Sequence, residues 1–105
     1  MSQPQFKISK LREGEQIISY AFYDLRTKFP EIIFIFEARL EKLGSWKIKG
    51  SGTGNRLADM CFGERSNRED ADGSALFAAE DFARQYLKNK RLPLEYYKLE
   101  EIVNN

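Results

Sequence analysis

The stretch EIIFIFEARLE, residues 31–41, carries the clearest strand pattern in this chain. Side chains alternate between the two faces of an extended backbone. One face of this stretch would carry Phe34, Phe36, Ala38 and Leu40. The other face begins with Ile33 and Ile35 and ends in charged residues. The pattern therefore predicts a strand that is buried on both faces at its start and half exposed at its end.

The residues that follow predict two more strands. Residues 42–45 have the composition of a turn, and residues 46–50 then alternate between core-facing positions and lysines that point away from the core. Residues 57–64 are predicted to form a third strand. The acidic run SNREDADG, residues 66–73, is predicted to be a loop.

The clearest helix is predicted over residues 74–90, SALFAAEDFARQYLKNK. Acidic residues precede it and basic residues end it, an order that the helix dipole favours, and Pro93 would stop it. Apolar residues recur at helical spacing along one side. Together with the sheet face, this stripe predicts a shared core of Phe34, Phe36, Trp46, Ile48, Leu76, Ala79, Ala83 and Leu87.

Residues 15–29, EQIISYAFYDLRTKF, fit two patterns. As a helix they place their apolar residues on one stripe, whereas as a strand both faces are mixed. The aromatic and β-branched content favours a strand. We predict a helix from the cleaner stripe, ending before Pro30. Residues 5–11 are predicted as a short first strand, and residues 94–105 fit either a short helix or a last strand.

These elements predict one α+β domain over residues 1–105. It would have two layers, with two helices packed on an antiparallel sheet of three or four strands. The predicted order α-β-β-β-α, with an alanine-rich last helix, resembles the double-stranded RNA-binding fold. That family places a lysine cluster at the start of its last helix, where this chain has Glu69, Asp70 and Asp72. The resemblance is therefore one of topology.

The composition excludes several kinds of chemistry. The chain has no histidine and one cysteine, Cys61, so we expect neither a histidine-dependent catalytic site nor an ordinary zinc site. No enzyme activity and no cofactor are expected. The longest apolar run, residues 32–36, is far shorter than the ~20 residues of a membrane helix. The first residues lack the apolar core of a signal peptide, so we expect a cytoplasmic protein that binds no membrane.

The stretch SWKIKGSGTGNR, residues 45–56, holds three of the chain's seven glycines and no acidic residue. It lacks the further glycine of a dinucleotide-binding loop and the Gly-Lys-Ser/Thr of a P-loop. We predict that residues 51–55 form an exposed loop beside a basic strip; the alternative is an ordinary strand connection. This stretch and the basic segment 84–91 supply the candidate contacts to a nucleic-acid backbone: Trp46, Lys47, Lys49, Arg56, Lys88, Lys90 and Arg91.

Two functions stay open on the sequence. The first is a small accessory protein that binds nucleic acid weakly, and without sequence preference, through the glycine-rich loop. The second is a protein-binding adaptor or inhibitor. The chain could also form a homodimer. The net charge of +1 favours neither, but basic and acidic segments alternate along the chain. Basic segments on one face would favour nucleic acid, whereas separated segments and an apolar groove would favour a protein partner.

Overall fold

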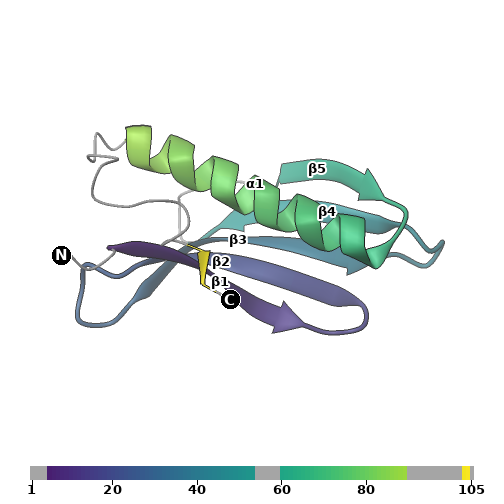
Figure 1. Ribbon diagram of the computed structural model, residues 1–105, viewed down its shortest axis with the longest axis horizontal. Helices are drawn as coiled ribbons and strands as arrows, with labels where there is room; N and C mark the ends of the chain where they lie inside the picture. The colour runs from purple at the N-terminus through teal and green to yellow at the C-terminus, as the bar shows by residue number, and fades with distance from the viewer. Residues whose placement is uncertain (1–4, 54–59, 90–102, 105) are drawn as a thin grey trace.

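The computed structural model describes residues 5–53, 60–89 and 103–104 (Figure 1). Its elements are β1 (Phe6–Glu13), β2 (Ile17–Asp24), β3 (Glu31–Leu40), β4 (Trp46–Gly52), β5 (Met60–Arg65), α1 (Arg68–Asn89) and the short β6 (Val103–Asn104). Within these residues the strands form one sheet in the order β5-β4-β3-β2-β1-β6. Strands β1 to β5 form an antiparallel meander, and β6 pairs in parallel with β1. The helix α1 lies across one face of this sheet (Figure 1).

The predicted architecture of two helices on a three- or four-stranded sheet is wrong. The chain begins with strands, and the described order up to the helix is β-β-β-β-β-α rather than α-β-β-β-α. The resemblance to the double-stranded RNA-binding fold therefore fails, because its first helix is replaced by the hairpin of β1 and β2. The α+β class is confirmed. In the part of the chain that the structure describes, no helix is both long and apolar enough to cross a bilayer.

The helix predicted over residues 15–29 is strand β2, and its position in the sheet explains the error. It lies between β1 and β3, so both of its edges are paired. Ile18, Tyr20 and Phe22 face α1, while Ser19 and Ala21 on the opposite face are also buried. A strand buried on both faces loses the clean alternation of apolar and polar residues. Its content of aromatic and β-branched residues was the correct signal.

The remaining strands lie close to their predicted ranges. The predictions for residues 5–11 and 31–41 correspond to β1 and β3. The strand predicted over residues 57–64 is observed as β5 from Met60, and residues 57–59 lie outside the described part.

The helix α1 begins six residues before its predicted start at residue 74, so most of the predicted acidic loop is helical. Asn67 caps it: the Asn67 Oδ1 accepts a hydrogen bond of 2.8 Å from the backbone N–H of Asp70. Glu69 and Asp70 then lie in the first turn, where the helix dipole favours negative charge. The early start extends the packing face, because alanines buried against the sheet recur every four residues at Ala71, Ala75, Ala79 and Ala83.

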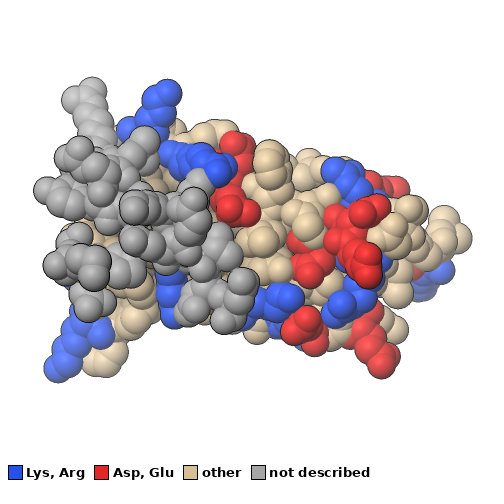
Figure 2. Space-filling model, viewed as in Figure 1, with Lys and Arg blue, Asp and Glu red and all other residues tan. Residues whose placement is uncertain are grey.

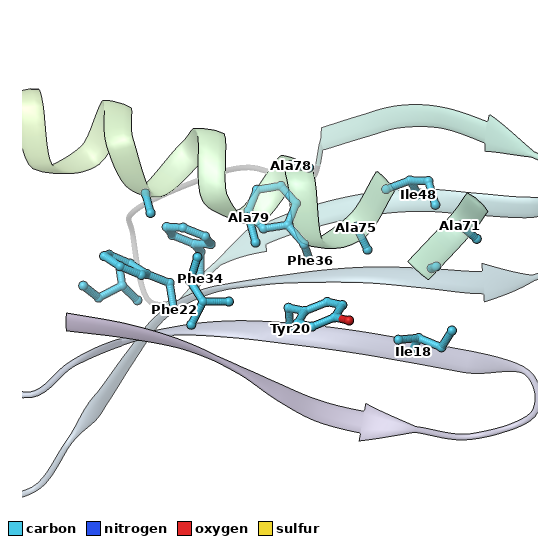
Figure 3. Close-up of a cluster of buried hydrophobic side chains, with 14 of the residues drawn as sticks. Ile18, Tyr20, Phe22, Phe34, Phe36, Ile48, Ala71, Ala75, Ala78 and Ala79 are labelled. Atoms are coloured by element: carbon cyan, nitrogen blue, oxygen red, sulfur yellow. The ribbon is translucent and has the colours of Figure 1, made fainter. Parts of the chain in front are cut away.

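The core lies between this alanine face and the aromatic side chains of the sheet. Figure 3 shows Phe22, Phe34 and Phe36 standing between the strands and α1. The ring centroids of Phe22 and Phe34, and those of Phe34 and Phe36, are 5.0 Å apart. Small helix residues let the backbone of α1 approach the large rings closely, so volume is matched across the two layers.

The predicted core is confirmed apart from one member. Seven of the eight residues are buried: Phe34, Phe36, Trp46, Ile48, Ala79, Ala83 and Leu87. Leu76 is partly buried at the margin of the core. The prediction omitted β1 and β2, which add Phe6, Ile8, Ile18, Tyr20 and Phe22.

Within the glycine-rich stretch, residues 46–52 form the strand β4, and Thr53 follows directly after it. Ser51 and Gly52 belong to β4 and lie opposite Ile35 and Phe34 of β3. Thr53 continues the pairing, since its backbone N–H donates a 3.0 Å hydrogen bond to the carbonyl of Ile33. The prediction of an exposed loop is therefore wrong for residues 51–53, and residues 54 and 55 lie outside the described range.

Candidate functional site

The four described residues among those predicted to contact nucleic acid are not gathered at one place. Trp46 faces α1 and is 5% exposed, so little of its ring is open to stacking with a base. Lys47 and Lys49 alternate with the buried Ile48 and lie on the helix-free face of the sheet. Lys88 is in the last turn of α1, in the other layer. Arg56, Lys90 and Arg91 lie outside the described residues.

A groove of about 750 Å³ lies between α1 and the edge strand β5. Its apolar part is aromatic and comes from both elements: Phe62 of β5, and Phe77 and Phe82 of α1. Phe82 forms the inner wall, because its ring lies 4.9 Å from that of Phe34 in the core. Phe62 is 38% exposed and Phe77 is 67% exposed. Two phenylalanine rings are thus left open to solvent beside a strand edge.

A bulge in β5 turns Phe62 into the groove. Ile48 of β4 lies opposite Gly63 and Lys49 lies opposite Cys61, so Phe62 is the extra residue of the bulge. Gly63 has φ of 108°, a conformation that residues with a side chain rarely adopt. The Phe62 ring packs 5.1 Å from the ring of Phe36. The edge strand is therefore fixed to the core through the same side chain that it presents to solvent.

The helix side of the groove has a small-and-large pattern. One stripe of α1 lines the groove with residues spaced four apart: Gly73, Phe77, Asp81 and Gln85. The lining residues Gly73, Ser74 and Ala78 are small, so they leave depth in front of the Phe77 ring. Sequence reasoning did not identify this stripe, because it considered only the apolar residues at core-facing positions of the helix. An isolated phenylalanine on the polar side was the available signal.

The charges around the groove are mainly negative. The carboxylates of Glu69, Asp70 and Asp81 line it, against the guanidinium of Arg65. The Asp81 Oδ2 accepts a 3.0 Å hydrogen bond from the Gln85 side chain, which holds that carboxylate on the groove side of the helix. Figure 2 shows acidic side chains over the first turns of α1. The groove is therefore aromatic in its walls and acidic at its margin.

A second polar cluster ties the first turns of α1 to the sheet. The Tyr20 hydroxyl donates a short hydrogen bond to the Asp72 Oδ1, and the Lys10 ammonium lies 3.6 Å from the Asp72 Oδ2. Burial, and then the hydrogen bond to Asp72, raise the pKa of Tyr20 well above its ordinary value. The tyrosine is 5% exposed, so its hydroxyl is a buried anchor. We assign this cluster to folding.

We expect Tyr20→Phe to destabilise the protein by about 1–2 kcal/mol at neutral pH, because Asp72 loses a donor. A tyrosine whose pKa is raised on folding stabilises the folded state below its ordinary pKa of 10.0, and this contribution is lost as the pH rises further. The gap between wild type and variant should therefore stay constant up to about pH 9 and shrink as the pH rises above 10.0, where the unfolded tyrosine ionises first. Urea unfolding curves of the two proteins, recorded in parallel at each pH, measure this gap. A gap that does not shrink above pH 10.0 would contradict the assignment.

Metal binding finds no support in the geometry of residues 5–53, 60–89 and 103–104. In these ranges no three cysteine, aspartate or glutamate side chains lie close enough together to hold an ion. The expectation that the protein binds no zinc stays a prediction, which elemental analysis of the purified protein would test.

Comparisons with protein-family models, with curated proteins and with solved structures found no match. They place the chain in no enzyme family. A functional proposal for this protein therefore depends on its surface alone.

Proposed function

We propose that this chain is a protein-binding module that docks its partner in the groove between α1 and β5. The observation that carries the proposal is the 67% exposure of Phe77 beside the partly exposed Phe62. Single apolar residues on a surface need no explanation, but a groove walled by aromatic rings with a charged margin has the make-up of a binding site. Buried aromatic anchors supply most of the affinity in many protein interfaces.

The charge distribution supports a protein partner over a nucleic acid at this groove. Its three carboxylates would repel phosphates. The described basic candidates are also divided between layers, with Lys47 and Lys49 on the helix-free sheet face and Lys88 on α1. Of the two arrangements considered from the sequence, separated basic residues with an apolar groove agree with the protein-binding alternative.

Photo-crosslinking in cells of the source organism tests the proposal. Benzoylphenylalanine at position 77 should form an adduct with a defined protein, identified by mass spectrometry. Position 29 is the matched control, because Phe29 is 76% exposed but lies in the β2–β3 turn and does not line the groove. The adduct should be absent from position 29. No adduct at position 77, or the same adducts at both positions, would reject the groove as the docking site.

A second candidate function is weak nucleic-acid binding on the helix-free sheet face. Lys47 lies directly opposite Arg39 of β3, and Lys49 is next on the same face, so three cations are adjacent there. Glu37, opposite Lys49, reduces the net positive charge of this group. The candidate therefore ranks below the groove.

A salt titration with short DNA and RNA duplexes and single strands tests this second candidate. Lys47→Ala and Lys49→Ala should each lower the slope of log affinity against log salt by about one unit. Lys88→Ala, in the other layer, is the control and should leave the slope unchanged. No binding by the wild type at low salt would reject this candidate.

A further inference from the structure

We propose, on the basis of the docking function above, that the partner supplies an extended segment with alternating apolar and basic side chains. This segment would add as a new strand to the outer edge of β5. Its apolar side chains would enter the groove, and its basic side chains would meet the carboxylates at the margin.

The strand edge supplies the first argument. Strand β5 ends the sheet order, and among the described residues its outer edge pairs with no other strand. An open edge presents backbone donors and acceptors that an extended peptide satisfies directly. The groove lies along this edge, because β5 supplies Phe62 and Arg65 to its lining. A segment paired with β5 would therefore run beside the exposed aromatic rings.

The pleat of the sheet supplies the second argument. Side chains of an added strand would point alternately toward the α1 layer and toward the helix-free face. Those on the α1 side would reach the space between Phe62 and Phe77. An apolar residue at every second position would cover both rings. The spacing required of the partner therefore follows from the strand geometry and from the position of α1.

Charge supplies the third argument and decides between a foreign segment and a second copy. Glu69, Asp70 and Asp81 outnumber Arg65 around the groove. A two-fold dimer formed by this face would bring the same carboxylates of both copies together, and like charges would oppose it. A segment carrying lysine or arginine would pair with them instead. The occupant that the groove fits is therefore a cationic segment from another protein.

Three fluorescent peptides test this inference by anisotropy. The first alternates lysine and phenylalanine, the second replaces each lysine by glutamate, and the third is the lysine peptide with N-methylated backbone amides on one edge. We expect the first to bind at least about tenfold more tightly than either of the others. Phe77→Ala and Asp81→Asn should each weaken its binding. Phe29→Ala is the control and should leave binding unchanged.

Hydrogen exchange provides a second measurement on the wild-type protein. The lysine peptide should slow the exchange of amides in β5 more than that of amides in β2, which is paired on both edges already. Equal binding of the glutamate peptide would overturn the charge argument, and equal binding of the N-methylated peptide would overturn strand addition.

Sedimentation equilibrium tests whether a second copy of this chain occupies the groove. A concentration-dependent dimer that Phe77→Asp dissociates would assign the groove to a second copy and overturn the inference. A monomer at all concentrations supports it. If position 77 crosslinks to a partner but the peptides fail these tests, the docking function stands and only the cationic strand is rejected. Failure of both experiments would reject the groove itself.

Discussion

Replacing Phe36 by alanine should lower the free energy of unfolding by about 3–5 kcal/mol. The Phe36 side chain is fully buried, and its ring packs against three others. The centroid distances are 5.0 Å to Phe34, 5.1 Å to Phe62 and 5.6 Å to Phe82. Alanine would remove a ring that contacts both the sheet and α1. It would leave a cavity that the surrounding side chains cannot fully fill. Urea unfolding followed by circular dichroism measures the loss.

The matched control is Phe29→Ala. Phe29 is 76% exposed, so removing the same ring should change stability by no more than about 0.5 kcal/mol. Phe36→Leu restores most of the buried volume and should cost less than Phe36→Ala. If the alanine variants at positions 36 and 29 had similar midpoints, the proposed core would be incorrect. Removing the Phe36 ring should also let Phe62 change its orientation, because the two rings pack together, and so weaken binding in the groove.

Gly50→Ala should destabilise the protein by about 1–3 kcal/mol through crowding rather than through a cavity. A Cβ atom at position 50 would lie 2.3 Å from the Phe36 Cε1 and 2.9 Å from the Phe62 Cε2. Real Cβ atoms do not approach carbon so closely, so at least one of these rings must move. Two aromatic rings pack over the backbone of β4 at Gly50 and leave no space for a Cβ atom. Thermal unfolding of the variant measures the cost.

Gly73→Ala is the control that separates crowding from a general effect of losing a glycine. A Cβ atom at position 73 would meet nothing within 4 Å, and the residue lies inside α1. The change should therefore stabilise the protein by about 0.5–1 kcal/mol. Adding Phe36→Leu to Gly50→Ala should relieve the clash, so the double variant should be more stable than the sum of the two single losses predicts. Strict additivity would contradict the crowding mechanism.

The Gly50 result also separates two interpretations of the glycine-rich stretch. A glycine needed for ligand contact would change binding when replaced and leave stability nearly unchanged. The observed packing predicts a loss of stability instead, because Gly50 of β4 lies directly beneath the ring of Phe36 from β3. Motif spacing alone was compatible with both interpretations.

Local periodicity was sufficient for the elements that have one buried side. The alternation in β3 and β4 predicted their inward faces, and the alanine stripe predicted the side of α1 that packs on them. The period of each sequence shows which side is buried, because most of the buried residues lie on the face between sheet and helix, with Ile33 of β3 as an exception. The core residues Phe34, Ile48 and Ala83 were identified in this way.

Only the tertiary structure decided β2 and the groove. Strand β2 is paired along both edges and buried on both faces, so its sequence shows no dominant period that distinguishes strand from helix. The groove depends on Phe62 and Phe77, whose proximity is fixed by a bulge in β5 and by the packing of α1 against the sheet. The sequence by itself determined which residues are apolar, the α+β class and the absence of histidine chemistry. Contacts between residues distant in the chain determined which apolar side chains are left at the surface, because burial depends on neighbours that local spacing does not encode.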